Sequence, residues 1–356
     1  MFLSLLYFLG ISFVSFLVLL PLFSWLGKGL TGKYEVKKDV WVYMWVISLA
    51  MFSSVYFFLP DLKDTINNVK YLNVLTAFGL SAFIYLAFLL EVDWLLYLSM
   101  AISSALVTWM LPSDIVIFEN NIPLIAERLI IFASLFMITF FAKILNGMSA
   151  IFGIFSLTIL VGICLISLIG GLPFSYGLLA SGLLGMWLSF LKFNWYPSEI
   201  YLNDGACASA GFLFGYFILC GVQEYAGSSL IILLTYLVAE ILWVVVRRYI
   251  LRIKEPEFYN NTAYFVCYYK DINIYAILIA IAKIGVVNVI FSAFQVYAIN
   301  AFTIPAFMII INLWLLNVLY RANDEEVGFK KANEILIEDI KDGLKTITTS
   351  LKKGKE

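Results

Sequence analysis

The stretch Phe193–Tyr216 reads FNWYPSEIYLNDGACASAGFLFGY, and it places a polar segment between two long apolar ones. One aspartate, Asp204, stands in a turn of small residues directly before an apolar segment spaced by Gly211 and Gly215. An acid at the border of a membrane segment is a candidate for function, because burying its charge without a purpose is costly. We therefore expect Asp204 to mark a site where a membrane helix meets water.

The composition of the chain is that of an integral membrane protein. Of its 356 residues, 63% are hydrophobic and 13% are charged, and the mean hydropathy is +0.95. A soluble domain could not bury this much apolar surface. The net charge of −1 gives no basis for nucleic-acid binding. The chain has no histidine, so a bound metal would need oxygen ligands, which suits Mg²⁺ or Mn²⁺.

Because a span needs about 20 apolar residues, the sequence predicts an all-α polytopic membrane bundle of about eleven transmembrane helices. The predicted spans are 2–26, 41–59, 71–90, 95–112, 129–142, 149–169, 173–191, 207–222, 229–246, 272–294 and 302–320. Residues 1–320 would form this bundle together with its connecting loops. In the tail 321–356, apolar residues recur at steps of three and four, which predicts a cytoplasmic amphipathic helix.

Lysine and arginine are distributed unevenly between the two sets of loops. With the N-terminus outside, 19 of the 23 lie in the inward segments and three in the outward ones, while Lys283 falls inside a span. Positive residues mark the cytoplasmic side. We therefore expect a multi-pass protein of the cytoplasmic (inner) membrane with its N-terminus outside, its C-terminus in the cytoplasm and an odd number of spans.

Four inward loops carry polar groups that could meet at one site on the cytoplasmic face. Their candidate residues are Glu91 and Asp93; Lys143 and Asn146; Asn194 and Asp204; and Arg247, Arg248 and Arg252. Acids can hold a divalent metal, and arginines pair with phosphates through two parallel hydrogen bonds. Simpler interpretations also remain open. Glu91 and Asp93 could merely end a span, the segment around Asn146 could be an ordinary turn, and the arginines could only set the orientation of the protein in the membrane. Glu240 and Lys283 are the only Asp, Glu, Lys or Arg residues inside the predicted spans.

Three segments resemble the polyprenyl-phosphate N-acetylhexosamine-1-phosphate transferases, the membrane enzymes that begin lipid-linked glycan synthesis for cell walls and O-antigens. The first segment is Leu183–Asp204, which is similar to the family run G-F-L-x-F-N-x-x-P-A-x-I-F-M-G-D-x-G-S. The second is Phe141–Gly153, where the family has N-x-x-D-G-x-D-G-L. The third is Phe88–Asp93, at the place of G-x-x-D-D. The order of the loops and the eleven-span layout agree as well.

This resemblance implies a divergent, metal-dependent transferase that moves a sugar-1-phosphate from a nucleotide sugar to a polyprenyl-phosphate lipid. It implies that Asp204, with Asn146, holds Mg²⁺ or Mn²⁺. Glu91 and Asp93 would act on the lipid phosphate. The implied substrate-binding residues are Lys143, Asn194, Arg247, Arg248 and Arg252. A homo-oligomer is a further expectation.

The sequence also departs from the family, and two other functions therefore stay open. The aspartate pair reads Glu91-Val92, the acids of the next motif read Asn146 and Ser149, and the histidine signature before the tenth span is absent. Losing several acids weakens a site for a hard cation. One alternative is a catalytically inactive relative that binds a lipid phosphate or a partner enzyme. The other is a transporter or polymerase of lipid-linked glycans.

Overall fold

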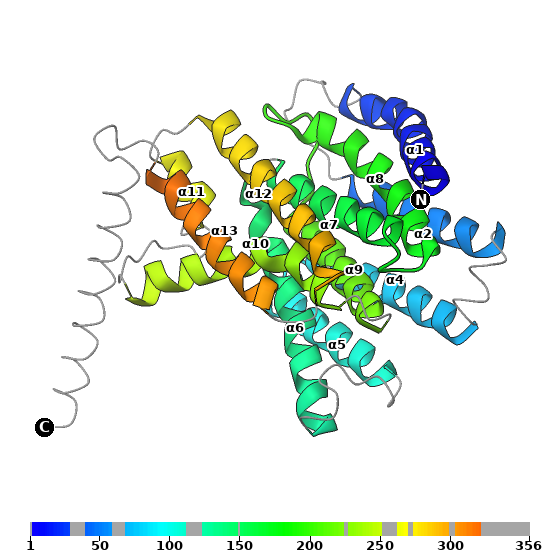
Figure 1. Cartoon of the computed structure of the whole chain (residues 1–356), viewed down its shortest axis with the longest axis horizontal. Helices are drawn as coiled ribbons and strands as arrows, with labels where there is room; N and C mark the ends of the chain where they lie inside the picture. The colour runs from blue at the N-terminus through cyan, green and yellow to red at the C-terminus, as the bar shows by residue number, and fades with distance from the viewer. Residues whose placement is uncertain are drawn as a thin grey trace, which may run out of the picture.

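The computed structural model describes residues 2–28, 40–58, 68–111, 123–148, 150–223, 227–250, 262–269, 273–298 and 303–321. Its regular elements in these ranges are helices, arranged as one bundle (Figure 1). They are α1 (Phe2–Lys28), α2 (Trp41–Phe58), α4 (Asn68–Leu89), α5 (Asp93–Met110), α6 (Leu124–Ile144), η1 (Leu145–Gly147), α7 (Ile151–Leu168), α8 (Phe174–Asn194), α9 (Asp204–Gln223), α10 (Gly227–Val245), η2 (Val246–Ile250), α11 (Ala263–Tyr269), α12 (Ile274–Gln295) and α13 (Thr303–Arg321).

The lengths and composition of these helices indicate a multi-pass membrane protein. Within the described ranges, nine helices are long and apolar enough to cross a membrane. Two further apolar helices, Trp41–Ser54 and Asn73–Leu89, are shorter by the same measure. Each of the eleven predicted spans coincides with one of these eleven helices. The all-helical membrane fold is therefore confirmed.

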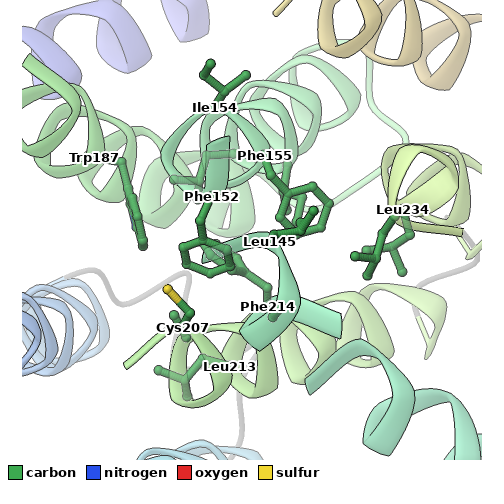
Figure 2. Packing of buried hydrophobic residues seen from close by; sticks show 14 of the residues in the cluster. Leu145, Phe152, Ile154, Phe155, Trp187, Cys207, Leu213, Phe214 and Leu234 are labelled. Carbon is green, nitrogen blue, oxygen red and sulfur yellow. The ribbon is translucent and has the colours of Figure 1, made fainter. Parts of the chain in front are cut away.

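Three helices form the centre of the bundle. In the 18-residue apolar stretch of α9, 83% of the residues are buried, against 22% in the corresponding stretch of α1. Helix α9 is therefore enclosed by protein, while α1 lies at the edge of the bundle. The aromatic side chains Phe152 of α7, Trp187 of α8 and Phe214 of α9 meet there (Figure 2). The Trp187 ring lies 5.7 Å from that of Phe152 and 5.8 Å from that of Phe214, measured between centroids. Such contacts fix the three helices relative to one another.

Small residues let α9 approach two neighbouring helices closely. A Cβ added at Gly211 would meet Ala142 of α6, and one added at Gly205 would meet Phe88 of α4. Because glycine has no side chain, α9 can pack close to its neighbours at these two points, as is common between membrane helices. The first turn of α9, which carries Asp204, is therefore held against the last turn of α4.

The structure differs from the sequence-based expectation in two places. Helix α6 begins at Leu124 rather than near 129, so Glu127, expected in a loop, is a buried residue of its first turn. The segment 247–271, expected to be a loop, contains the π-helical turn η2 and the short helix α11. Arg252 and the tail beyond Arg321 lie outside the described residues, so the predicted amphipathic helix is not described.

Candidate functional site

The candidate site centres on a hydrogen-bonded pair formed by Asn146 and Asp204. Asn146 lies in η1 after α6, and Asp204 is the first residue of α9. The Asn146 amide nitrogen donates to Asp204 Oδ1 at 3.0 Å, although 58 positions separate the two residues. The structure therefore brings together the two residues expected to hold a metal.

The local sequence explains why Asp204 is held at a helix start. The side-chain oxygen of Asn203 accepts a hydrogen bond from the backbone N–H of Ala206 at 2.7 Å, which is the geometry of an N-cap. Asp204 follows directly and lies in the first turn, where the helix dipole favours a negative charge. The N-cap and the first turn of α9 thus place the Asp204 carboxylate beside Asn146.

Asn194 joins the two connectors that border the pair. Its amide oxygen accepts from the backbone N–H of Ala150, and its amide nitrogen donates to the carbonyl of Ile200, both at 2.9 Å. Ala150 has a φ of 71°, so the turn before α7 adopts a left-handed conformation that this hydrogen bond stabilises. Asn194 was expected to bind substrate. In the structure, both its amide oxygen and its amide nitrogen form hydrogen bonds to the backbone around the site.

A cavity of about 190 Å³ lies beside these groups. Its wall combines amides and hydroxyls with a floor of buried apolar side chains. The lining residues are Asn146, Gly147, Met148, Ala150, Phe152, Phe190, Asn194, Ser198, Tyr201 and Leu202. Asn146 lines this cavity and also donates to Asp204, so the pair adjoins the cavity through the Asn146 side chain.

Helix α11 supports the pair from a part of the chain that the sequence interpretation treated as a loop. The Tyr264 hydroxyl donates to the carbonyl of Ile144, at the end of α6, at 2.7 Å. A Cβ at Gly147 would meet the Phe265 ring, so this glycine lets α11 pack directly on η1. Tyr264 is fully buried, and this burial, with the Glu240 carboxylate nearby, raises its pKa well above the usual range. It therefore acts as a neutral hydrogen-bond donor.

Glu240 fixes α11 in turn. Its two carboxylate oxygens accept from the Tyr236 hydroxyl at 3.1 Å and from the backbone N–H of Ala263 at 2.9 Å. The sequence singled out Glu240 as an ionisable residue in a span, but no pattern indicated its partners. Sequence reasoning missed Tyr264 and the partners of Glu240, because these contacts join segments far apart in the chain.

Glu91 lies in the exposed turn between α4 and α5, and Asp93 is the exposed first residue of α5. Glu91 has a φ of 56°, which closes the turn. This turn lies beside the start of α9, because Phe88 packs against Gly205. The two carboxylates are thus exposed at the same end of the bundle as Asp204, and their part in catalysis stays a prediction.

Of the four expected cations, three are placed at the same end of the bundle and one falls outside the described ranges. The Lys143 ammonium lies 3.4 Å from the Tyr97 hydroxyl and 5.1 Å from the centre of its ring, so it ties α6 to α5. Arg247 is buried in η2, with its guanidinium 5.5 Å from the Tyr320 ring of α13. Arg248 is half-buried beside it, and Arg252 is outside the described residues. Their binding of substrate stays a prediction.

The donor set at the pair fits a small hard cation only in part. No group of three His, Cys, Asp or Glu side chains lies together in the part of the chain that the structure describes. The pair offers one carboxylate and, through Asn146, one amide oxygen. Mg²⁺ is commonly bound by one or two carboxylates with substrate phosphates and water completing its shell. The site therefore fits a cation that arrives with, or is completed by, a phosphorylated ligand.

No protein-family model matches this chain, and no curated protein matches it.

Proposed function

We propose that this chain transfers a sugar-1-phosphate from a nucleotide sugar to a polyprenyl-phosphate lipid at the cytoplasmic face of the inner membrane. The observation that carries the proposal is the Asn146–Asp204 hydrogen bond beside a polar cavity at the end of the helix bundle. The resemblance of the three segments around Glu91, Asn146 and Asp204 to the transferase family supports the same reaction.

The proposed step exchanges one phosphate linkage for another. An oxygen of the lipid phosphate forms a bond to the phosphorus next to the sugar, and the bond from that phosphorus to the nucleoside monophosphate breaks. A bound divalent cation would neutralise charge on the diphosphate. Asp204, helped by the amide oxygen of Asn146, would hold that cation, since a carboxylate keeps acceptor capacity beyond one hydrogen bond.

The other residues have proposed roles in binding and proton transfer. Glu91 and Asp93 would orient the lipid phosphate or take its proton, because they are exposed carboxylates beside the first turn of α9. Lys143, with Arg247, Arg248 and Arg252, would neutralise the donor phosphates. Asn194 would keep the cavity in shape through its two backbone hydrogen bonds.

An apolar groove of about 460 Å³ between α6, α9 and α10 suits the lipid chain. Its lining is almost entirely aliphatic: Ile130, Ile131, Ala133, Ser134, Leu135, Met137, Ile138, Gly215, Ile218, Leu219, Ile231, Leu234, Leu237, Val238 and Ile241. Helices α6 and α9 run from this groove to Asn146 and Asp204. A prenyl chain in the groove would thus leave its phosphate directed toward the polar end.

The proposal includes eleven spans with the N-terminus outside. The uneven distribution of lysine and arginine supports it, as does the coincidence of all eleven predicted spans with helices. A cysteine at Ser198, which lines the cavity, should react with an impermeant thiol reagent only when the cytoplasmic side is accessible. The four native cysteines would first be replaced. Labelling of intact cells from outside would overturn this orientation.

The direct test of the function is nucleotide release. Purified protein with Mg²⁺ or Mn²⁺ and undecaprenyl phosphate would be given a panel of UDP-sugars. We expect release of UMP from at least one donor, and none when the lipid is omitted. Failure to release UMP from any donor, with protein that remains folded, would contradict a transferase that uses uridine nucleotides.

A second candidate function is favoured by the small number of acidic side chains at the site. The residues around Asp204 include the neutral side chains Asn146 and Asn194 where a metal enzyme would gain from acids. An inactive relative would keep this cavity as a binding site for a lipid phosphate. Tight binding of undecaprenyl phosphate without turnover of any donor would favour this candidate.

A further inference from the structure

The lysine Lys283 of α12 lies on the outer surface of the bundle, apart from the candidate site. Exposed side chains on α12 recur at steps of three and four and form one stripe: Tyr275, Ile279, Lys283, Val286, Ile290 and Phe294. The opposite side of the helix, including Ile281 and Ile284, is buried against the bundle. Figure 1 shows α12 running along the front of the molecule, with the central helices behind it. We call these six residues the α12 stripe.

The position of Lys283 along the helix places its charge deep in the membrane. It follows Ile274 by nine residues and precedes Gln295 by twelve. At a rise of about 1.5 Å per residue, these separations correspond to about 13 and 18 Å. The α12 stripe therefore presents a cation close to the middle of a span, between aliphatic side chains on both sides.

Such a cation is costly unless something compensates it. Charged residues within a membrane normally face the protein interior, line a water-filled cavity or pair with an opposite charge. Lys283 is exposed, and no hydrogen bond or ion pair reaches it from the residues that the structure describes. By contrast, Glu240 is buried and bonded to Tyr236 and Ala263. The compensating group for Lys283 must come from outside the described chain.

We propose that the α12 stripe is an interface for a transmembrane helix of a different membrane protein, and that this helix carries an aspartate or glutamate at the depth of Lys283. Charge complementarity identifies this occupant, because an ion pair in a medium of low dielectric replaces two isolated charges. The aliphatic residues on either side of Lys283 would pack along the same helix. This inference is independent of the transferase reaction.

A second copy of this chain does not meet the requirement. Pairing two copies through their α12 stripes would bring two Lys283 ammonium groups together, and like charges repel. Among the described residues, Glu127 and Glu240 of the spanning helices are both buried within their own chain. Asp93 and Asp204 are the first residues of α5 and α9, so they lie at helix ends and not at the depth of Lys283. The partner therefore carries an acid that the described residues of this chain do not present at this depth.

The test is site-specific photocrosslinking in membranes of the source organism. The photoreactive residue p-benzoylphenylalanine replaces Val286, three residues from Lys283 on the same stripe. The same residue at Val18, an exposed position of α1, is the matched control. Crosslinked peptides are identified by mass spectrometry. The measurement is then repeated with Lys283→Leu and Lys283→Arg.

We expect a crosslink from position 286, and not from position 18, to a spanning segment that contains an Asp or Glu. Lys283→Leu should reduce this product at least tenfold, whereas Lys283→Arg should retain it. Exchanging the charges, with Lys283→Asp and a lysine in place of the partner's acid, should restore it. Crosslinks only to lipid or to a second copy would overturn the proposal, as would a product that Lys283→Leu leaves unchanged. Thermal unfolding of each variant confirms that it is folded.

Discussion

Two polar centres in this bundle differ in what surrounds them. At the candidate site, Asn146, Asp204 and Asn194 connect η1, α8 and α9 beside a cavity. In the interior between α10, α12 and α13, Asn312 donates to Thr235 at 2.9 Å and to Asn288 at 3.1 Å. All three of these residues are almost completely buried.

The difference separates structural polar groups from functional ones. In the interior centre, Asn288 Nδ2 and Asn312 Oδ1 have no hydrogen-bond partner among the described residues, and protein encloses them. Polar side chains of this kind hold membrane helices together. At the candidate site, the polar groups border open space at the end of the helices. Only the candidate site can exchange a ligand with water. Substitutions there should therefore lower activity more than stability, whereas substitutions in the interior centre should lower stability more than activity.

The largest effect is expected from Asp204→Asn. Because the carboxylate would hold charge at the reacting phosphate, kcat/KM should fall on the order of 100- to 1,000-fold, about 3–4 kcal/mol. The free energy of unfolding should change by only about 0.5 kcal/mol, as is usual for a substitution that keeps shape near a surface. Steady-state UMP release and thermal unfolding check the two parts. Unchanged turnover would remove Asp204 from the mechanism.

The next largest effect, on stability instead of activity, is expected from Asn312→Leu. Removing this amide takes the donor away from Thr235 and Asn288, which should cost about 1–2 kcal/mol. Turnover per folded molecule should stay the same. Unfolding in detergent measures the loss. The double variant Asn288→Leu with Asn312→Leu is the control, because removing both amides leaves fewer unpaired groups and should recover part of the stability.

A smaller effect on both properties is expected from Tyr264→Phe. The variant keeps the ring but leaves the Ile144 carbonyl without the donor that joins α11 to the end of α6. Losing one such hydrogen bond costs about 1 kcal/mol, and loosening η1 should lower kcat by roughly fivefold. Phe265→Leu is a useful companion, since it disturbs packing on Gly147 and keeps the hydrogen bond. A Tyr264 variant with full activity would show that α11 does not position the pair.

The smallest effect is expected from Lys143→Ala. The ammonium contacts Tyr97 at an exposed position, so its loss should change stability by less than about 0.5 kcal/mol. If it neutralises donor phosphates, KM for the nucleotide sugar should rise while kcat changes little. Lys143→Arg should retain most of the affinity. Initial rates over a range of donor concentrations distinguish the two, and an unchanged KM would leave Lys143 with its structural contact alone.

The spans could be predicted from the sequence because a helix that crosses the hydrocarbon core of a membrane needs about 20 apolar residues, and such runs can be recognised directly in the sequence. The start of α6 was placed too late because Glu127 and Arg128 count as aqueous residues, whereas the fold buries Glu127. The Asn146–Asp204 pair was expected from the resemblance of its two segments to one family. The Tyr264–Ile144 contact could not be expected, since it joins residues 120 positions apart and α11 is too short to give a periodic signal.

The most direct measurement follows the phosphorus atom that the reaction is proposed to move. A UDP-sugar labelled with ³²P at the phosphorus next to the sugar would be incubated with the protein, Mg²⁺ and undecaprenyl phosphate, and the lipid then extracted. We expect the label in the lipid fraction, with unlabelled UMP left in water, and no transfer by Asp204→Asn. Label that stays in water while the sugar enters the lipid, or that remains in intact donor, would contradict transfer of a sugar-1-phosphate.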